Sequence, residues 1–333
     1  MINKRILLIY TGGTIGMVKD KLKKTLVPFN FDELLKAIPE LKSEDVDLDN
    51  ISVANPIDSS NMNTTVWTEI AILIKRNYKN YDGFIILHGT DTMAYTASAL
   101  SFMLEGLNKA VILTGSQIPI GARRSDAKEN LITAVEIATS GKVSEVCVCF
   151  ENQLYKGCRT VKVNTEHFEA FESPNYPILA EAGVSIKYKS SLSKPQDTKL
   201  IVHQNMSNDV AILKLFPGIT ITTIKAIINS AKGIVIESFG AGNAPNTAEL
   251  STLLSTADKK GKILVNITQC LQGSVVDGQY ETSEPFAKSG VISGEDLTTE
   301  AAITKLMFLL GKGLSAEEIK TELQKNIRGE ITN

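Results

Sequence analysis

The chain has 333 residues, of which 43% are hydrophobic and 22% are charged, and its formal net charge is −2 at pH 7. This composition is ordinary for a soluble globular protein with one large or two medium domains, and the small net charge argues against a nucleic-acid partner. No apolar run approaches the length of a membrane-spanning helix and no export signal is recognisable, so we expect no membrane association and a cytoplasmic location.

The first predicted strand, residues 6–10, runs directly into a Thr-Gly-Gly-Thr turn at 11–14. A nucleotide site is unlikely there, because the dinucleotide fingerprint requires G-x-G-x-x-G and Thr11 stands where its first glycine belongs. The charged segment 17–29 follows. It is either an active-site lid with Gly16 as its hinge or a solvated surface loop.

A second apolar strand at 84–87 ends at Gly89, and Thr90, Asp91 and Thr92 come immediately after it. Apolar residues at helical spacing then predict a helix over 93–107. In an open α/β sheet, ligands bind at such strand-to-helix turns. The alternative is that Asp91 or Thr92 merely caps the helix.

A third strand, 110–114, runs into Gly115 and Ser116, so three strand ends each deliver glycine with a small polar group. In a parallel sheet these ends lie on one edge and can surround a small polar ligand. A helix is predicted from Asp126, with Glu129 completing a capping box. Strand 146–150 places two of the four cysteines on one face, where we expect reduced core thiols.

The second half reads as a smaller α/β domain. Its predicted strands lie at 210–216, 234–237 and 263–267, with helical patterns between them and a final helix opened by a Ser315 capping box. We therefore predict domains at 1–188 and 210–333, joined by a linker at 189–209.

The polar residues at the strand ends favour a threonine nucleophile. A serine hydrolase is disfavoured because no G-x-S-x-G motif occurs, and His88 at a strand end is more typical of a packed residue than of a base. A threonine hydroxyl needs a base, and lysine serves when its neutral form is accessible. Thr14, Thr90, Asp91 and Lys162 would supply a nucleophile, a relay hydroxyl, an orienting acid and a base for amide hydrolysis. The alternative for Lys162 is a solvated surface charge.

The chain resembles the cytoplasmic, type I group of L-asparaginases, within the asparaginase/glutaminase family. The resemblance runs in order through nearly the whole chain, and the short glycine motif alone would be weak. The matching stretches are 10–17, 86–96, 114–117, 159–162, 170–175, 239–245 and 266–270.

The resemblance implies a two-domain α/β fold with a larger N-terminal parallel or mixed sheet covered by helices on both faces. It implies self-association as a dimer or tetramer, L-asparagine as substrate, and no cofactor or metal. Thr14 resembles the nucleophile, and Thr90, Asp91 and Lys162 resemble the second catalytic group. The implied substrate-binding residues are Asp58, Ser59, Ser60, Gly89, Ser116 and Asn243, the last donated by the partner subunit.

One departure concerns a tyrosine that many relatives carry in the lid. The segment 17–29 contains none, and Tyr280 is the candidate for the missing phenol, with a packed surface tyrosine as the alternative. Two other functions are alternatives. One is the amidase subunit of a transfer-RNA-dependent amidotransferase, which shares these motifs, and the other is a non-catalytic amino-acid sensor on the same fold.

A second departure concerns regulation. In allosterically activated relatives, asparagine also binds an intersubunit site that uses an arginine at the position of Glu237 and a threonine at the position of Val161, near the cysteine that matches Cys270. Glu237 reverses that charge, and Val161 removes the hydroxyl. The sequence therefore predicts no activation by asparagine.

Overall fold

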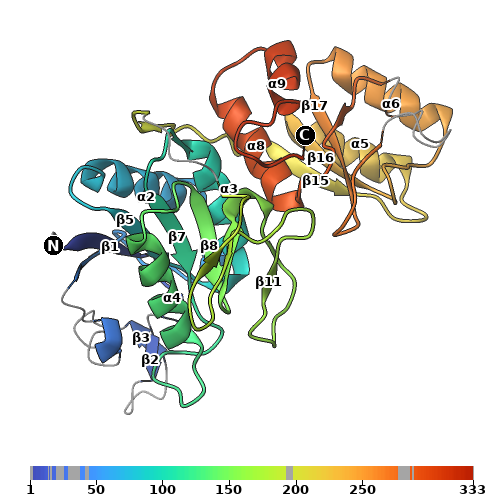
Figure 1. The fold of residues 1–333 in the computed structure, drawn as a ribbon. Helices are drawn as coiled ribbons and strands as arrows, with labels where there is room; N and C mark the ends of the chain where they lie inside the picture. Colours follow the sequence, from blue (N-terminus) through green and yellow to red (C-terminus); the bar gives the residue numbers. More distant parts are fainter. Residues whose placement is uncertain are drawn as a thin grey trace. The chain divides into compact units, whose positions relative to one another are not determined.

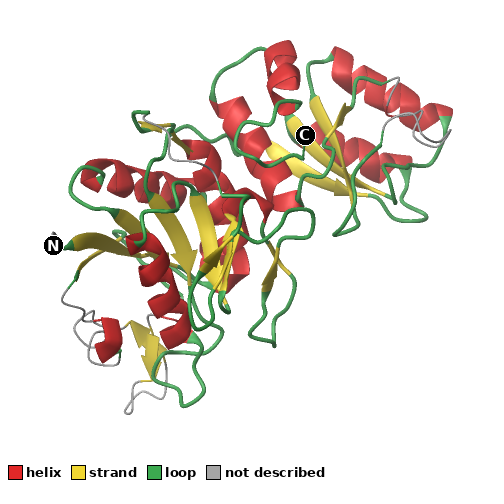
Figure 2. Cartoon of the chain, viewed as in Figure 1, coloured by secondary structure: helices red, strands yellow, loops and turns green. Residues whose placement is uncertain are grey.

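The computed structural model describes residues 3–13, 15, 17–19, 26–28, 38–41, 45–192, 198–276, 286 and 289–332. The chain divides into two compact units, Met1–Gln204 and Asn205–Asn333. The division falls inside the segment 189–209. Each unit is an α/β structure with its own sheet (Figures 1 and 2), so the predicted fold class is confirmed.

The N-terminal unit is built on an eight-stranded sheet in the order β13-β12-β9-β8-β7-β5-β1-β4. Strands β4, β1, β5, β7 and β8 pair in parallel, and β9, β12 and β13 continue the sheet antiparallel. The strands are β1 (Lys4–Tyr10), β4 (Val46–Ser52), β5 (Gly83–Leu87), β7 (Ala110–Thr114), β8 (Val146–Phe150), β9 (Gln153–Lys156), β12 (Ala180–Glu181) and β13 (Lys187–Tyr188).

Three two-stranded ladders lie outside this sheet. They are β2 (Met17–Lys19) with β3 (Leu26–Pro28), β6 (Leu104–Glu105) with β14 (Ile201–Val202), and β10 (Val161–Lys162) with β11 (Phe171–Glu172). The first ladder lies in the predicted lid, whose remaining residues are outside the described part of the chain. Whether this segment closes over a ligand stays a prediction.

Helices cover both faces of the large sheet (Figure 1). They are α2 (Thr64–Asn77), α3 (Met93–Met103) and α4 (Ala127–Thr139), with short 3₁₀ turns η2 (Pro39–Leu41), η3 (Ser59–Asn61), η4 (Thr90–Thr92) and η5 (Gly157–Arg159). Alternate residues of each strand face opposite sides. Accordingly, Ile6 and Leu8 of β1 pack in one cluster with Leu131 of α4, and Cys147 and Cys149 of β8 belong to the same cluster.

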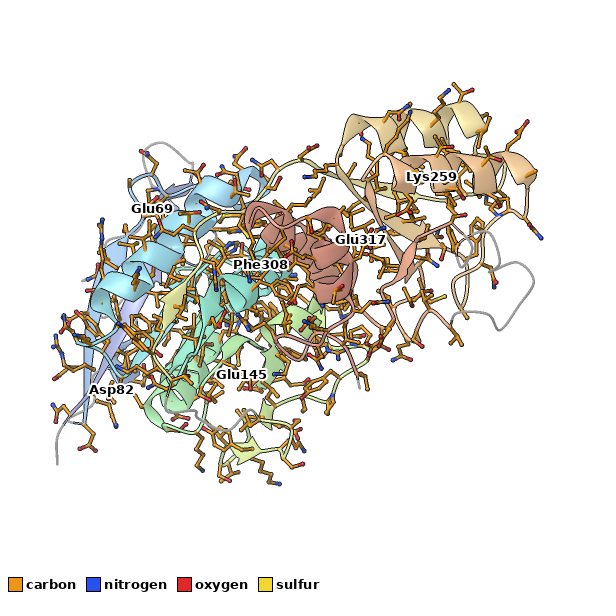
Figure 3. The ribbon with its side chains drawn as sticks, turned by 90° about the horizontal axis from the view of Figure 1, so that it is seen from above. Glu69, Asp82, Glu145, Lys259, Phe308 and Glu317 are labelled. Carbon is orange, nitrogen blue, oxygen red and sulfur yellow. The ribbon has the colours of Figure 1, made fainter. Side chains whose placement is uncertain are left out.

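The C-terminal unit has a four-stranded parallel sheet in the order β15-β16-β17-β18. Its elements are β15 (Val210–Lys214), α5 (Ile221–Ser230), β16 (Gly233–Ser238), α6 (Ala248–Lys259), β17 (Ile263–Thr268), β18 (Ile292–Ser293), α8 (Thr299–Gly311) and α9 (Ala316–Leu323). The Ser315 capping box is confirmed. Phe308 of α8, labelled in Figure 3, is 1% exposed.

Two sequence expectations were wrong in detail. The helix predicted over 93–107 ends at Met103, because Leu104 and Glu105 pair with β14 and Gly106 then takes a positive φ of 75°. Asp126 precedes α4 but makes no capping bond. Its carboxylate instead accepts the backbone N–H groups of the loop that follows β7.

Among the residues that the structure describes, no helix is both long and apolar enough to cross a bilayer.

Candidate active site

The three predicted strand ends meet at one edge of the large sheet. Leu87 at the end of β5 stands beside Tyr10 of β1 and Thr114 of β7 in the parallel register. The backbone contact continues past the strands, because Thr11 N–H donates to Leu87 O at 3.1 Å and His88 N–H donates to Thr114 O at 2.9 Å. The turns that follow the strands are therefore held side by side.

Two of these turns touch through glycine backbone. Gly13 has a φ of +86°, a left-handed conformation that glycine adopts at low cost. A Cβ on Gly13 would lie 2.4 Å from Gly89 N, and a Cβ on Gly89 would lie 2.5 Å from the Ser59 hydroxyl. Since real Cβ atoms do not approach other atoms so closely, only glycine fits at these two positions. This close contact fixes the position of the Gly89 backbone, and therefore of Thr90, which follows it in the sequence.

Thr90, Asp91 and Lys162 form a hydrogen-bonded cluster at this edge. Lys162 Nζ donates to Thr90 Oγ1 at 2.8 Å and to Asp91 Oδ1 at 2.7 Å. The Lys162 side chain is 14% exposed, whereas that of Asp91 is 64% exposed. The lysine is thus shielded but not sealed from solvent, and the surface-charge alternative is wrong. Because Asp91 is largely exposed, the ion pair adds little stability, and its main effect is to fix the direction of Nζ.

Lys162 reaches the cluster from a crossing segment that is anchored in the core. It lies on β10, where it pairs with Phe171 of β11. The preceding turn η5 contains Arg159, which is 1% exposed and stacks over the Tyr176 ring at 5.1 Å. Thr160 Oγ1 also donates to Lys156 O at 2.8 Å. Because this segment is firmly held, the long Lys162 side chain can place its amine at a defined point.

Helix capping does not account for the Thr90–Thr92 turn. Thr92 is the N-cap residue of α3, but its side chain makes no capping bond. Its hydroxyl donates instead to Ser59 O at 2.7 Å. Asp91 is engaged with Lys162 rather than with the helix. The side chains of Asp91 and Thr92 therefore bond to residues around Thr90 and do not cap α3.

The loop containing Asp58, Ser59 and Ser60 is docked against the same turn. Ser59 is buried beside Gly89, while Asp58 and Ser60 are exposed. The Ser60 hydroxyl and backbone N–H both donate to Asp58 Oδ1, at 2.7 and 2.8 Å. These two bonds lower the pKa of the Asp58 carboxyl below its ordinary value. The two bonds thereby favour the charged form of the carboxylate.

Gln117 is a site residue that the sequence reasoning missed. Thr90 Oγ1 donates to Gln117 Oε1 at 3.0 Å, and Gln117 Nε2 donates to His167 O at 3.3 Å. A backbone carbonyl only accepts hydrogen bonds, so the His167 contact fixes which end of the amide faces Thr90. The turn Gly-Ser-Gln after β7 was the available signal.

His88 is buried directly beneath the turn, as its strand-end position predicts. It is fully buried, and burial lowers the pKa of its imidazole to about 4 against a weaker opposing effect of the hydrogen bond to Gly89 O. At neutral pH it is therefore uncharged and out of reach of solvent. It lies below the site without lining it.

The remaining predicted residues are placed differently. Ser116 is 2% exposed, and its hydroxyl has no hydrogen-bond partner among the described residues. Asn243 belongs to the C-terminal unit, where it closes a turn by exchanging backbone bonds with Phe239. It is therefore not part of the cluster within the N-terminal unit. Thr14 and Tyr280 lie outside the described residues.

Asn243 nevertheless sits on a well-supported turn. Thr268 Oγ1 donates to Gly240 O at 2.6 Å, and Asn266 Nδ2 donates to Gly242 O at 3.3 Å. Both supporting side chains project from the end of β17. The stretch 266–270 matches the family in sequence, but no role was predicted for it.

Comparisons with known proteins place this arrangement in a family. The N-terminal asparaginase domain family matches residues 5–194, and the glutaminase/asparaginase C-terminal domain family matches residues 209–323. L-asparaginase 1 of Escherichia coli K12 is 42% identical over 335 residues, covering 100% of this chain and 99% of that protein.

Solved structures agree with the sequence matches. The crystal structure of L-asparaginase I from Vibrio cholerae has a TM-score of 0.92 at 40% identity and covers 99% of this chain and 100% of its own. The thermostable L-asparaginase from Thermococcus kodakarensis has a TM-score of 0.93 at 33% identity, with 99% of both chains covered. Because sequence and fold agree along the whole length, the chain belongs to the asparaginase family.

Proposed function

We propose that this protein hydrolyses L-asparagine to L-aspartate and ammonia in the cytoplasm, with Thr14 as nucleophile. The observation that carries the proposal is the contact of Lys162 Nζ with both Thr90 and Asp91 at the ligand-binding edge of a parallel sheet. The names of the whole-length relatives agree with this reaction. A sensor that had lost catalysis would have no need to keep this set of groups.

In the proposed first step, the Thr14 hydroxyl oxygen attacks the side-chain amide carbon of asparagine. Its proton passes through Thr90 to Lys162 in its neutral form, and Asp91 orients the lysine. Backbone N–H groups at the strand ends hold the tetrahedral oxyanion. The carbon–nitrogen bond then breaks, and the returned proton leaves with ammonia. Water attacks the resulting ester, which releases aspartate and restores the threonine hydroxyl.

Substrate recognition is assigned to the polar groups around this centre. The Asp58 carboxylate, with Oδ1 held by Ser60, is suited to the α-ammonium of an amino acid. The unpartnered hydroxyl of buried Ser116 is a polar group that a bound ligand would satisfy. Ser60 stands where glutaminase-capable relatives often carry glutamine, so we expect asparagine to be strongly preferred over glutamine.

Asn243 is proposed to complete the site from a neighbouring subunit. This role requires a dimer or tetramer, which the family resemblance implies. Thr268 and Asn266 hold the turn that carries Asn243, so the side-chain amide of Asn243 extends from a fixed backbone position. Tyr280 remains the candidate for the phenol that the lid lacks.

The test is ammonia release from asparagine and from glutamine, measured on the wild type and on Thr14→Val and Lys162→Met. Each variant should lose several orders of magnitude in turnover, the scale expected on removing a nucleophile or its base. Thr252→Val and Lys79→Met make the same chemical changes at exposed positions and should behave as wild type. Near-normal turnover in a folded Thr14→Val protein would refute the nucleophile. Comparable kcat/KM for the two substrates would refute the preference.

A further inference from the structure

Behind the Thr90 turn runs a buried chain of three hydrogen bonds. Trp67 Nε1 of α2 donates to Thr96 Oγ1 of α3 at 2.9 Å. Thr96 Oγ1 lies 2.8 Å from His88 Nε2, and His88 Nδ1 lies 2.6 Å from Gly89 O. His88 and Thr96 are fully buried, and Trp67 is 6% exposed. The chain thus links two helices to the peptide group that immediately precedes Thr90.

The chemistry of the partners fixes the tautomer of His88. Gly89 O only accepts, so His88 Nδ1 must carry the hydrogen, because two lone pairs facing each other at 2.6 Å would repel. Nε2 is then the acceptor, and it takes the one hydroxyl hydrogen of Thr96. The Thr96 oxygen is left to accept from Trp67, whose indole only donates. Only this arrangement gives each donor in the three hydrogen bonds an acceptor.

We propose that His88, as the neutral Nδ1–H tautomer, is a positioning residue that fixes the Gly89–Thr90 peptide plane and thereby aims Thr90 at Lys162. The peptide is planar and trans, so holding the Gly89 carbonyl toward the interior directs the Thr90 N–H the opposite way. The same plane sets where the Thr90 side chain leaves the backbone. Its hydroxyl then needs a defined direction to bond Lys162 and Gln117. The role rests on the proposed function, in which Thr90 is the relay.

A direct catalytic role for His88 does not fit the geometry. Both ring nitrogens are already bonded, and the ring has no exposed surface. Simple packing does not fit either, because a residue that only filled space would not need a nitrogen at each of two particular points. The burial that lowers the pKa of His88 to about 4 supports the same conclusion, since it keeps Nε2 available as an acceptor at working pH.

The tautomer is tested on the wild type by nuclear magnetic resonance of ¹⁵N-histidine-labelled protein. Three histidines are present in the chain, and His88→Asn identifies the signal that disappears. We expect that signal to show a protonated Nδ1 and an unprotonated Nε2, unchanged between pH 6 and 8, a range chosen above the depressed pKa. An Nε2–H tautomer, or titration within this range, would overturn the proposal without any reference to activity.

The positioning role is tested by kinetics of His88→Asn and His88→Gln. The asparagine amide nitrogen lies near the place of Nδ1 and keeps a donor for Gly89 O, whereas the longer glutamine side chain carries its amide toward the place of Nε2. We expect His88→Asn to keep kcat within about threefold and His88→Gln to lose about ten- to a hundredfold in kcat with little change in KM. Equal kcat in the two folded variants, or the reverse order, would overturn the role.

Three further variants test the Thr96 contact and control for an unrelated histidine. Thr96→Ser should retain kcat and Thr96→Val should lower it, because only the first keeps the hydroxyl that holds Nε2. His203→Gln, which alters a histidine paired with Glu105 away from this chain, should leave kcat unchanged. A wild type that releases no ammonia would refute the proposed function, while the tautomer measurement would still decide whether His88 has the form assigned to it.

Discussion

The hydroxyl of Thr90 stands between Lys162 and Gln117, accepting a hydrogen bond from Nζ at 2.8 Å and donating one to Oε1 at 3.0 Å. The polarity of this row follows from the His167 carbonyl, which holds the other end of the Gln117 amide. With its own hydrogen turned toward Gln117, Thr90 presents a lone pair to the lysine. Gln117 therefore sets the resting direction of the Thr90 hydroxyl.

We predict that Gln117→Met, which keeps the length and removes the acceptor, lowers kcat/KM for asparagine about tenfold, the effect of losing one polar contact worth roughly 1.4 kcal/mol. Steady-state kinetics with coupled ammonia detection measure it. Gln324→Met makes the same change at an exposed position just past α9 and should leave the constants unaltered. Unchanged kcat/KM in Gln117→Met would mean that Thr90 needs no acceptor.

The depressed pKa of His88 makes a prediction about acid stability. The folded state holds the pKa at about 4, below the ordinary value of 6.5, so the unfolded chain binds more protons between these values. Stability attributable to His88 is therefore retained above pH 6.5 and lost as the pH falls toward 4, by up to about 3 kcal/mol. Urea unfolding of wild type and His88→Asn at pH 8, 6 and 5 isolates this term. The advantage of the wild type over the variant should shrink as the pH drops, and a constant difference would contradict the buried neutral state.

If Asn243 serves the neighbour's site, two inactive variants should rescue each other. In a mixed dimer of Lys162→Met and Asn243→Ala, one site carries both defects and the other carries neither. Statistical mixing by joint refolding should then restore about a quarter of wild-type activity, because half of the dimers are mixed and each has one intact site. Sedimentation of the mixture checks that dimers or tetramers have formed. No recovery in a properly assembled mixture would place Asn243 in its own subunit's site, or in none.

Glu237 predicts a simple saturation curve. Its side chain is 10% exposed, and its carboxylate pairs with Lys214 Nζ at 3.2 Å and accepts the Thr299 hydroxyl at 2.7 Å. A negative, already bonded group opposes an amino-acid carboxylate at the position where activated relatives carry arginine. The initial rate should therefore rise hyperbolically with asparagine concentration over the whole saturation range. Sigmoidicity that is abolished by changes near Cys270, and not by changes at the active site, would contradict this.

The sequence predicted the site best where chemistry depends on strand ends. The turns after β1, β5 and β7 were found because a buried apolar strand followed by glycine is a strong local pattern. Lys162 was proposed from the resemblance and from its loop, and the structure brings it to Thr90. The smaller second sheet followed from the spacing of apolar strands and helices, whereas the larger N-terminal sheet was implied by the family resemblance.

What the sequence missed depends on contacts between distant segments. Asp126 and Glu129 form a good local capping pattern, but the loop after β7 has unpaired N–H groups nearby, and Asp126 bonds those instead. Gln117 gained its role from Thr90 and His167, neither of which is close to it in the chain. Leu104 does not continue the helix, because it pairs with β14 as a strand residue. In each case a contact with a distant segment overrides the local conformational preference.

The contact between Gly13 and Gly89 has a consequence for redesigning this enzyme. A Cβ on Gly13 would collide with the Gly89 backbone and a Cβ on Gly89 with the Ser59 side chain, so this part of the proposed site can be neither enlarged by truncation nor narrowed by a larger residue. In a saturation library, both positions should be intolerant even though neither offers a side chain to the substrate. If Ser60 and Ser116 bind the substrate as proposed, selection for a longer or shorter substrate would have to act through these two side chains.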